Sequence, residues 1–415
     1  MQAATPMRPE SADQVAEAVR TAIVESRRLD VIASGTKAGW GRPTDADARL
    51  DLAGLAGGVL YEPEELVLTA KPGTPLAEIE ALLAERRQHL AFEPPDLSQL
   101  FGCDAAAPPS NAGGTLGGAF LCNLAGPRRI KAGAARDHIL GFQAVSGRGE
   151  CFKAGGRVVK NVTGFDLSKL IAGSFGTLAA VTELTVRALP APEDSRTVVL
   201  FGLSDPDGSR AMALALTSAC DVSGAAHLPA GIASASSVPA IAASTGSATL
   251  LRLEGPARSV ASRSRELSVL LGPLGTPLVL EAPESGGAWR EIRDAFFFVA
   301  LPQHQVWRLS VPPSAGADVV ARILGRVAGE AFYDWGGGLI WLALDPGVDA
   351  CEAAVRGAVG ISGGHATLLR APSEVRARVS VFQPQPPPLA ALTRRIKDAF
   401  DPHRVLNPGR MYADI

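Results

Sequence analysis

The chain of 415 residues has few of the residues that build metal centres or disulfide frameworks. Its five cysteines are odd in number, lie far apart and form no C-x-x-C pair, and its six histidines are scattered without the spacing of helical metal ligands. This pattern argues against a disulfide framework, a zinc site or an iron–sulfur cluster on this chain. We therefore expect no resident metal, and reduced, mostly buried thiols of the kind found in cytosolic proteins.

Long apolar runs and excess charge are missing as well. Residues 1–10 contain no apolar segment of the kind a signal peptide needs, and no apolar run reaches about 18 residues. We therefore expect neither a signal peptide nor a membrane span. The formal net charge is −2, which gives no indication of a nucleic-acid-binding surface.

The common motifs for nucleotide phosphates and for hydrolysis are also absent. The sequence has no G-x-x-x-x-G-K-[ST], no G-x-G-x-x-G between a strand and a helix, and no H-E-x-x-H. Residues 360–364 match G-x-S-x-G but lack the flanking strand and helix of a nucleophile elbow, so we interpret them as a chance match in a turn. A chain without a convincing nucleophile or metal often delegates its chemistry to an organic cofactor.

What the sequence does contain is a glycine-rich tract over residues 108–190, with glycines crowded at residues 113–118, 155–156 and 173–176. Because glycine has no Cβ, such segments let the backbone approach a flat or anionic group closely. A second loop of small residues, 34–41, follows a short predicted strand, and its successive N–H groups could form an anion-binding nest. The alternative is that this loop is only a tight connection.

Hydrophobic periodicity and turn residues predict an α/β or α+β unit for the first part of the chain and an α+β domain for the second. Residues 12–27 form an amphipathic pattern, and a second helix is predicted to begin at Pro75 with Thr74 as its N-cap. Further strands are predicted at residues 29–33, 49–52, 65–70, 139–145, 150–153, 157–160, 179–188, 197–202, 249–254 and 307–311, and further helices at residues 167–172, 207–219, 257–271, 317–327 and 389–400.

The composition changes near Leu189, where a region rich in Ala, Ser and Pro begins. We predict a cofactor-binding domain over residues 1–190 and an α+β cap or substrate-side domain over residues 191–395. Residues 396–415 are predicted to return to the interface between them. Trp335 and Trp341 are expected in the core or at the rim of the second domain.

Six tracts together resemble the flavoprotein family of vanillyl-alcohol oxidase and p-cresol methylhydroxylase (PCMH). They are residues 113–118 (GGTLGG), 126–129 (GPRR), 160–166 (KNVTGFD), 173–178 (GSFGTL), 364–367 (GHAT) and 407–410 (NPGR). Within this family the chain is similar to the smaller of the two FAD-binding subunits of bacterial glycolate oxidase. The resemblance is dense over residues 30–190 and thin over 195–360. It implies a PCMH-type FAD-binding domain that is itself two-lobed, together with a separate α+β cap domain.

Carried onto this sequence, the resemblance implies which residues hold FAD. The backbone of residues 34–37 would hold the pyrophosphate, residues 110–118 would line its pyrophosphate and ribityl side, and residues 173–178 would lie against the flavin and adenosine. Asn407 would approach the isoalloxazine ring from the side of the second domain. The implied set is Ser34, Gly35, Thr36, Lys37, Ser110, Asn111, Gly113, Gly114, Thr115, Leu116, Gly117, Gly118, Gly173, Gly176, Thr177, Leu178 and Asn407.

The sequence departs from the family pattern at several of these places. Lys37 stands in the first glycine loop, where covalent flavoproteins of this type carry a histidine, so we expect non-covalent FAD. Ala33 and Ser34 make that loop poorer in glycine, Phe165 replaces a common tyrosine, and Ala179 replaces a common glycine. These changes keep open an interpretation in which the fold is retained and catalysis is lost.

No residue stands out as catalytic, and the candidates are Lys160, His365 and Arg410. Lys160 could stabilise negative charge near N1 of the reduced flavin, or be a strand-end lysine in an ion pair. His365 could act as the base in 2-hydroxy-acid oxidation, or be a turn histidine bound by backbone. Arg410, like Arg128 and Arg129, could pair with a substrate carboxylate or an FAD phosphate, or belong to a solvated face or subunit contact.

The resemblance implies an FAD-dependent oxidoreductase that oxidises glycolate to glyoxylate as part of a glycolate oxidase complex. Its partners would be a larger FAD-binding glycolate oxidase subunit and an iron–sulfur subunit that receives the electrons. We expect a cytoplasmic location, with any contact with the inner face of the membrane made through the complex. Two alternatives are a self-sufficient FAD-dependent dehydrogenase for a small 2-hydroxy acid such as D-lactate, and a non-catalytic scaffold subunit.

Overall fold

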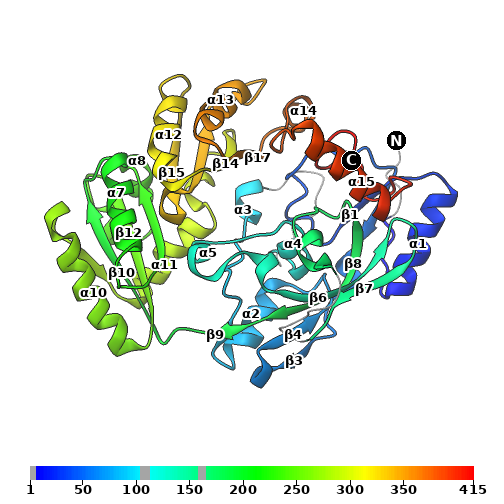
Figure 1. The fold of residues 1–415 in the computed structure, drawn as a ribbon, viewed down its shortest axis with the longest axis horizontal. Helices are drawn as coiled ribbons and strands as arrows, with labels where there is room; N and C mark the ends of the chain where they lie inside the picture. Colours follow the sequence, from blue (N-terminus) through cyan, green and yellow to red (C-terminus); the bar gives the residue numbers. More distant parts are fainter. Residues whose placement is uncertain (1–5, 103–112, 158–164) are drawn as a thin grey trace.

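The computed structural model describes residues 6–102, 113–157 and 165–415, which form two lobes (Figure 1). The first lobe is built around a five-stranded sheet within residues 60–187, and the second lobe around an eight-stranded sheet within residues 194–370. Residues 387–415 return to the first lobe, so both termini lie there. The α+β class predicted from the sequence is confirmed.

The sheet of the first lobe is antiparallel, in the order β3-β4-β8-β6-β7. Its strands are β3 (Leu60–Glu62), β4 (Val67–Ala70), β6 (Ile139–Ser146), β7 (Cys151–Gly155) and β8 (Ala179–Arg187). The central strand β8 is buried over most of its length, whereas the edge strand β7 alternates between exposed and half-buried residues. That alternation is typical of a strand with one face toward solvent.

An N-terminal helix and a parallel strand pair complete this lobe. They are α1 (Ala12–Val24), β1 (Leu29–Ile32) and β2 (Ala48–Asp51). Ser11 caps α1 by accepting a hydrogen bond from the Gln14 N–H, and Val15 and Val19 are fully buried beneath the helix. The four-residue spacing therefore predicted the helix, although it ends at Val24 instead of residue 27.

Short elements connect the strands of the first lobe. They are η1 (Leu52–Gly54), η2 (Pro63–Glu65), α2 (Leu76–Ala84), α3 (Ser98–Phe101), α4 (Leu116–Leu121), α5 (Arg129–Ala132), η3 (Ala135–Asp137), α6 (Leu167–Ile171) and the pair of β5 (Gln88–His89) with β9 (Leu189–Pro190). The expected N-cap of α2 was wrong, because Pro75 takes that position. The Thr74 hydroxyl instead donates to Lys71 O at 2.8 Å and accepts from the Gly57 N–H at 3.0 Å, which ties a turn.

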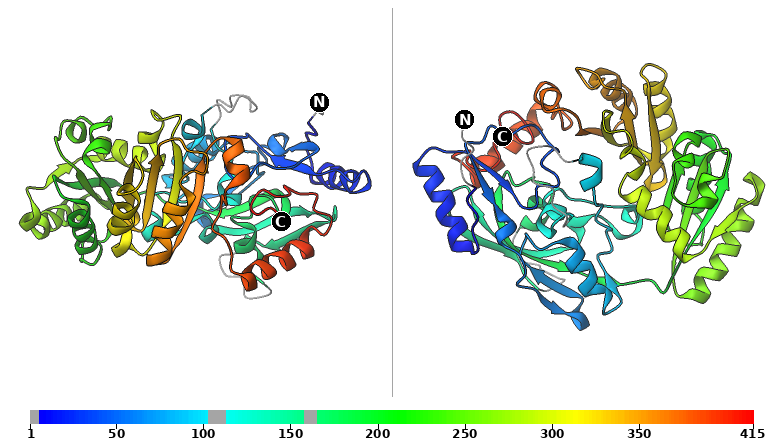
Figure 2. Two further views of the ribbon diagram at one scale, coloured as in Figure 1. Left: turned by 90° about the horizontal axis from the view of Figure 1, so that it is seen from above. Right: turned by 180° about the vertical axis from the view of Figure 1, so that it is seen from behind.

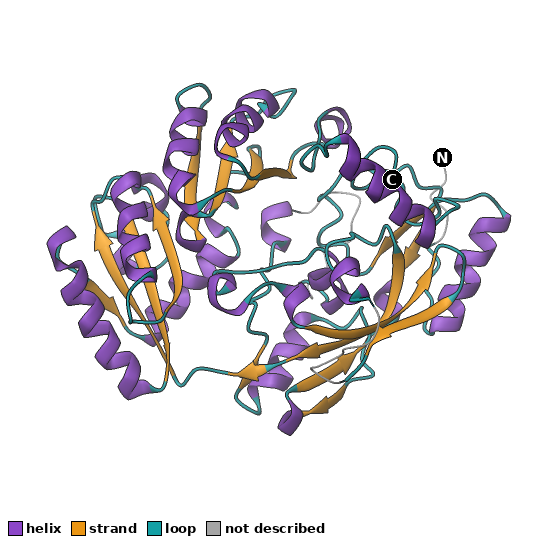
Figure 3. Ribbon diagram, viewed as in Figure 1, coloured by secondary structure: helices purple, strands orange, loops and turns teal. Residues whose placement is uncertain are grey.

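The sheet of the second lobe has the strand order β13-β10-β12-β11-β15-β16-β14-β17, and helices flank its strands (Figure 3). Its strands are β10 (Asp194–Phe201), β11 (Val222–Leu228), β12 (Ala248–Gly255), β13 (Leu278–Leu280), β14 (Gln305–Ser310), β15 (Gly329–Asp334), β16 (Leu339–Leu344) and β17 (His365–Arg370). Its helices are α7 (Asp205–Leu216), α8 (Ala230–Ser234), α9 (Pro239–Ala242), α10 (Ala257–Leu271), η4 (Gly272–Leu274), α11 (Ala282–Arg293), η5 (Phe296–Phe298), η6 (Pro313–Ala315), α12 (Gly316–Leu324), η7 (Trp335–Gly337) and α13 (Glu352–Ser362).

The C-terminal segment packs back onto the first lobe. It contains α14 (Ser373–Arg378) and α15 (Pro387–Phe400), and α15 lies beside the strands of the first lobe (Figure 2). The Gly147 N–H in the β6–β7 turn donates to Phe400 O at 2.9 Å, and the rings of Phe152 and Phe400 lie 5.9 Å apart. Leu406 then forms a parallel bridge with Leu29 of β1, which brings the end of the chain beside its first strand.

Two of the strands that the sequence missed share one property. Strands β11 and β16 are buried along their whole length, so they lack the alternation of polar and apolar residues that marks a half-buried strand. Helix α10, which has one buried face and one exposed face, spans the predicted residues. Of the strand predicted at residues 157–160, Arg157 lies in a bend and the rest falls outside the described residues.

Two further findings concern only the part of the chain that the structure describes. None of its helices combines the length and the apolar character needed to cross a bilayer. Its His, Cys, Asp and Glu side chains form no group of three or more that could hold a metal ion. The described cysteines, Cys122, Cys151, Cys220 and Cys351, are free thiols.

Candidate cofactor site

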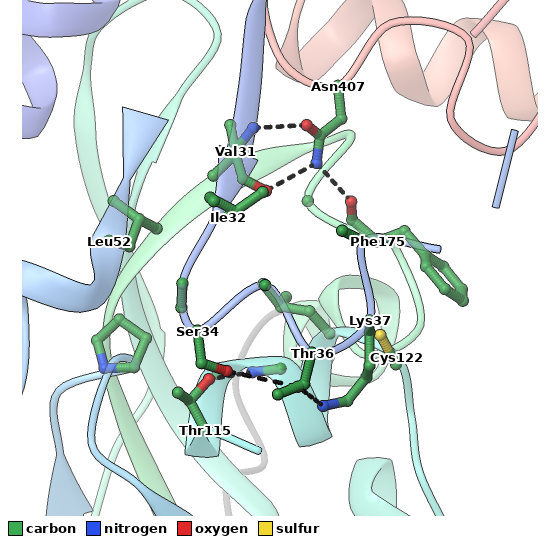
Figure 4. Close-up of a pocket in the computed structure, with 18 of the residues that line it drawn as sticks. Val31, Ile32, Ser34, Thr36, Lys37, Leu52, Thr115, Cys122, Phe175 and Asn407 are labelled. Atoms are coloured by element: carbon green, nitrogen blue, oxygen red, sulfur yellow. Dashed lines mark hydrogen bonds between the residues drawn. The ribbon is translucent and has the colours of Figure 1, made fainter. Parts of the chain in front are cut away.

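A pocket lies in the first lobe between the end of β1, the start of α4 and the C-terminal segment (Figure 4), with about 690 Å³ of empty space that is partly open to solvent. Its walls bring together four stretches that are far apart in the sequence. The lining residues are Val31, Ile32, Ala33, Ser34, Gly35, Thr36, Lys37, Ala38, Leu52, Pro72, Thr115, Gly117, Gly118, Leu121, Cys122, Phe175, Gly176, Asn407 and Arg410.

The first loop, residues 34–37, contributes four consecutive backbone N–H groups to this pocket. None of them donates a hydrogen bond to another described residue. The carbonyl oxygens of Gly35 and Lys37, in contrast, accept hydrogen bonds from the N–H groups of Ala38 and Trp40 at 2.9 and 3.0 Å. A loop with free donors and occupied acceptors is suited to an anionic group.

The Lys37 side chain adds a positive charge to the same wall. Its Nζ donates to Thr36 Oγ1 at 3.2 Å and lies over two glycines, since a Cβ at Gly114 or Gly118 would come within 3.2 or 3.4 Å of it. No described carboxylate lies within 4.0 Å of this ammonium. Burial lowers the pKa of Lys37, although nearby acidic groups act in the opposite direction. A half-buried cation with spare donors favours an anion beside it.

The glycine tract at the start of α4 uses its own N–H groups differently. The N–H groups of Leu116 and Gly117 donate to the carbonyl oxygens of Thr74 and Pro72, in the loop before α2, at 2.9 and 2.8 Å. The Gly118 N–H donates to the Thr115 hydroxyl at 3.2 Å. These three donors are therefore occupied within the protein. The tract gives the pocket its shape, while the first loop supplies N–H groups that no described residue accepts from.

Asn407 joins two walls of the pocket (Figure 4). Its Oδ1 accepts from the Val31 N–H at 2.7 Å, and its Nδ2 donates to Phe175 O at 2.8 Å. A Cβ at Gly176, where φ is +71°, would lie 2.8 Å from this Nδ2, so only glycine fits there. We expected Asn407 at the isoalloxazine ring. The structure gives its amide two backbone partners, and the approach to a ring stays a prediction.

Arg410 supports the first loop through a hydrogen bond to its backbone. Its Nη2 donates to Lys37 O at 2.9 Å, and its Nη1 lies 4.0 Å from Asp30 Oδ1. The side chain is buried, and that burial lowers the pKa of Arg410 while Asp30 acts in the opposite direction. The guanidinium is therefore part of the pocket wall instead of a solvated face.

These features fit FAD. The free N–H groups and the Lys37 ammonium provide donors for a diphosphate, and the apolar side chains of Val31, Leu52, Leu121 and Phe175 provide walls for a flat ring. Among the described lining residues, Cys122 is the one side chain with a nucleophilic sulfur or nitrogen besides the cations, and burial raises the pKa of its thiol.

The remaining expected residues fall into three groups. Gly113, Gly114, Leu116, Gly173, Thr177 and Leu178 flank the pocket without lining it. Ser110, Asn111 and Lys160 lie outside the described residues. His365 is exposed at the start of β17 in the second lobe, away from the lining set, whereas Arg410 belongs to that set.

A cationic cluster where the lobes meet was not predicted from the sequence. The Cζ atoms of Arg129 in α5 and Arg308 in β14 lie 4.5 and 5.0 Å from the centroid of the Trp335 ring. Trp335 Nε1 donates to Gly126 O of the first lobe at 3.0 Å, so this ring belongs to the contact between the lobes. The sequence had indicated Arg129 as a candidate for a substrate carboxylate, but neither Arg308 nor the contact of both arginines with Trp335.

Comparison with known proteins identifies the family. Residues 4–155 match the family described as FAD binding domain. Over 400 residues the chain is 34% identical to the glycolate oxidase subunit GlcE of Escherichia coli (strain K12), and the alignment covers 96% of this chain and 97% of that protein. The chain belongs to the GlcE family. It is therefore an FAD-binding oxidoreductase by family.

Other relatives of this GlcE-family chain share a shorter region. The chain is 34% identical over 138 residues to the glycolate oxidase subunit GlcD of Bacillus subtilis (strain 168), covering 33% of this chain and 26% of that protein. It is 33% identical over 147 residues to a D-lactate dehydrogenase of Archaeoglobus fulgidus, covering 34% and 32%. These two matches cover less than a third of the relatives' own lengths.

A solved structure confirms the predicted fold. A crystal structure of p-cresol methylhydroxylase with bound substrate superimposes with a TM-score of 0.72 at 15% identity, covering 98% of this chain and 88% of that one. At this identity the likeness concerns the fold alone. The GlcE-family chain thus has a PCMH-type FAD-binding fold with an α+β cap.

Proposed function

We propose that this chain is the FAD-binding subunit of a glycolate oxidase complex that converts glycolate into glyoxylate. The observation that carries the proposal is the pocket in which the Lys37 ammonium meets four N–H groups that have no partner among the described residues. It occurs in a chain similar to GlcE over nearly its whole length. Because that similarity extends through the second lobe, it includes the face that would cover the cofactor.

We propose a separate role for each lobe. Residues 1–190 hold FAD, residues 191–395 cover its reactive edge, and residues 396–415 return to the interface. Within the first lobe the N–H groups of residues 34–37 and the Lys37 ammonium bind the diphosphate, because these N–H groups are free of other described partners. FAD, when bound, supplies the acceptor for the hydride removed from the substrate.

We propose that FAD is bound without a covalent link. The first loop carries Lys37 where covalent flavoproteins of this type carry histidine. Cys122, the one cysteine among the described lining residues, is a poor nucleophile at neutral pH because burial raises its thiol pKa.

His365 is the proposed acceptor of the substrate hydroxyl proton. Its side chain is exposed at the start of β17 but partly desolvated by its neighbours, which lowers its pKa. The charges of Arg308 and Arg129 lower the pKa further, so the imidazole is neutral at pH 7 and free to take a proton. It opens β17 opposite Ser310 of β14, which places it near the lobe contact.

Further subunits complete the proposed pathway of electrons. The proposed partners are a larger FAD-binding glycolate oxidase subunit and an iron–sulfur subunit. Support comes from the names of two relatives, which are both subunits of a glycolate oxidase. We propose a cytoplasmic location, with any membrane contact made through the complex.

The visible spectrum of the purified chain, recorded before and after anaerobic addition of glycolate, tests the proposal. Flavin bands that bleach would mean that FAD and a working substrate site are both on this chain. Flavin bands that bleach only when the partner subunits are added would assign this chain to electron relay within the complex. A colourless chain that takes up no added FAD would overturn the proposal and leave the scaffold alternative.

A second candidate is a self-sufficient dehydrogenase for another 2-hydroxy acid. The match to a D-lactate dehydrogenase favours it, although that match covers only 34% of this chain. This candidate requires the isolated chain to reduce an artificial dye with D-lactate at a rate exceeding that with glycolate. Dye reduction that depends on the partner subunits would rule it out.

A further inference from the structure

Two arginines from different lobes meet at one tryptophan. Arg129 belongs to the first lobe and Arg308 to the second, and both guanidinium carbons lie within 5.0 Å of the Trp335 ring centroid. Both side chains are half-buried. Stacking against an aromatic ring fixes the plane of a guanidinium while leaving its N–H groups available to another partner.

Neither arginine has an anionic partner within the described part of the chain. Their guanidinium groups make no hydrogen bond there, and no described carboxylate lies within 4.0 Å of either. The neighbouring Arg128 and Arg252, in contrast, pair with Glu254 and Glu93. The two cations at Trp335 therefore differ from these paired arginines of the lobe contact.

The cluster carries an excess of positive charge. Burial, with Arg129 as the next cause, lowers the pKa of Arg308 to about 10. Asp334 acts in the opposite direction on Arg308, but burial raises its own pKa to about 7, so it is only partly ionised at neutral pH. A bound anion would relieve this repulsion.

Trp335, beside which both arginines lie, is held rigidly. Its backbone has φ of +53°, its N–H donates to Asp334 Oδ1 at 2.7 Å, and its Nε1 donates to Gly126 O at 3.0 Å. A bulky residue in the left-handed region is strained, and such strain clusters at functional sites. The ring is only 7% exposed, so it serves as a fixed plate that aligns the guanidinium groups.

The register of the sheet adds His365 to this cluster. Arg308 of β14 lies opposite Thr367 of β17, and Ser310 lies opposite His365. Residues that are opposite across a strand pair, or two apart along a strand, share one face of the sheet. His365 and Arg308 therefore lie on the same face, one diagonal step apart.

We propose that Arg129 and Arg308 together bind the carboxylate of a small 2-hydroxy acid beside Trp335, with its hydroxyl toward His365. A planar carboxylate accepts paired hydrogen bonds from a guanidinium fork, and two forks from opposite lobes clamp it where the lobes meet. The choice of a hydroxy acid rests on the proposed function. With this clamp, the substrate carboxylate is bound by this chain instead of by a partner subunit.

Calorimetric titration of the FAD-loaded chain with oxalate, which resembles glycolate in size, tests the clamp. Arg129→Gln and Arg308→Gln should each weaken oxalate binding about tenfold or more, as expected for a lost hydrogen bond to a charged group. Arg136→Gln is the matched control, because Arg136 is exposed, acts electrostatically on Arg129, and carries the same charge. It should change the affinity by less than about twofold. Equal effects of all three substitutions would overturn the proposal.

Two further measurements test the clamp without requiring that the glutamine variants fold. Arg308→Lys keeps the charge but not the planar fork, so it should still weaken oxalate binding severalfold. In the unaltered chain, oxalate should protect Arg129 and Arg308, but not Arg136, from an arginine-selective reagent such as phenylglyoxal, as read by peptide mass. Modification of Arg129 and Arg308 at unchanged rates would contradict the clamp.

The outcomes separate the clamp from the proposed function. In one outcome, glycolate bleaches FAD, but substitution of Arg129 or Arg308 leaves oxalate binding unchanged. This outcome would support the proposed function and overturn the clamp. In another outcome, oxalate binding depends on Arg129 and Arg308, but the chain takes up no FAD. This outcome would support the clamp and overturn the proposed function. Inorganic phosphate binding as tightly as oxalate at the same two arginines would mark a general anion site and overturn the assignment to a hydroxy acid.

Discussion

At the scale of single residues, the pocket depends on side chains whose hydrogen-bonding groups are used in very different ways. Among the described residues, the three donors of the Lys37 ammonium have one hydrogen-bond partner, the Thr36 hydroxyl, and the side chain is half-buried. Asn407 uses both ends of its amide on the backbone of Val31 and Phe175. We therefore expect Lys37 to matter for the ligand and Asn407 to matter for the pocket itself.

Lys37→Met should lower the affinity for FAD about tenfold or more, because a charged hydrogen bond to the diphosphate is lost. The same substitution should slightly raise the thermal midpoint of the FAD-free chain, since burial disfavours the charge that it removes. Fluorescence titration with FAD and a melting curve measure the two effects. Lys37→Arg, which keeps the charge, is the control, and unaltered FAD affinity in Lys37→Met would contradict the role.

Asn407→Ala should lower the free energy of unfolding by about 1–3 kcal/mol, because the buried N–H of Val31 and the carbonyl of Phe175 lose their partner. Asn407→Asp should be at least as damaging, since it sets a carboxylate oxygen against Phe175 O while keeping the acceptor for Val31. Urea unfolding measures both variants. An Asp variant as stable as the unaltered chain would show that the Phe175 bond contributes little.

At the scale of elements, helix α15 is attached to the pocket through a fully buried ion pair. Lys397 Nζ donates to Asp401 Oδ2 at 2.7 Å and to the carbonyl oxygens of Thr177 and Leu406 at 2.6 and 2.9 Å. Asp401 also accepts from the N–H groups of Val405 and Leu406. The pair thus ties the end of α15 to the turn that leads into β8 and to the segment that carries Asn407.

Lys397→Met should therefore destabilise the chain by about 3–5 kcal/mol, because it leaves the buried Asp401 carboxylate without its counter-ion. The double variant Lys397→Met with Asp401→Leu should recover only part of this loss, since the backbone N–H groups that bind Asp401 would then lack an acceptor. Chemical unfolding of the three proteins checks this. Full recovery in the double variant would mean that the backbone contacts of Asp401 are unimportant.

At the scale of the whole molecule, four charged side chains join the lobes. Arg252 of the second lobe binds both oxygens of Glu93 at 2.8 Å, and Arg128 of the first lobe binds Glu254. The Arg128 Nη1 also donates to His89 Nδ1 at 2.8 Å, which requires a neutral imidazole. This network makes the contact between the lobes sensitive to acid in two separate ranges of pH.

The first range belongs to Glu93. The two arginines, acting against burial, lower its pKa from 4.5 to about 2. A depressed carboxyl pKa means that its stabilisation is complete above pH 4.5 and is lost as the pH falls from 4.5 to 2, by about 3 kcal/mol. Glu93→Gln should flatten the stability profile in that range, measured by urea unfolding at a series of pH values. Glu64→Gln, at an exposed site, should leave the profile unchanged.

The second range belongs to His89. Burial, followed by the charge of Arg128, lowers its pKa from 6.5 to about 4. The unfolded chain therefore binds more protons between pH 6.5 and 4, and stability falls across that range by roughly 3 kcal/mol as the pH decreases. His89→Gln keeps an acceptor for Arg128 and should remove this slope. An unchanged slope, or an equal effect of His403→Gln at an exposed site, would contradict the assignment to His89.

The amino-acid sequence alone is enough to predict the elements whose residues repeat with a clear period and the loops that need glycine. Helix α10 and strands β6, β8, β10 and β12 lie where periodicity predicted them, because each has a buried and a more exposed face or flanking turn residues. The resemblance of the glycine tracts predicted the PCMH-type fold and FAD, which the comparisons bear out. The first loop and Gly176 line the pocket, and the sequence could indicate them because their chemistry is local: small residues that leave the backbone accessible.

Which residues that are far apart in the chain contact one another depends on the folded structure. Whether the N–H groups of residues 34–37 or those of Leu116 and Gly117 are free depends on which carbonyl oxygens lie opposite them, and no local pattern records this. The same holds for Asn407 against Val31, for Glu93 against Arg252, and for Arg129 and Arg308 at Trp335. A hydrogen bond or an ion pair between residues far apart in the chain is set by packing, whereas the sequence specifies only which groups are available to form it.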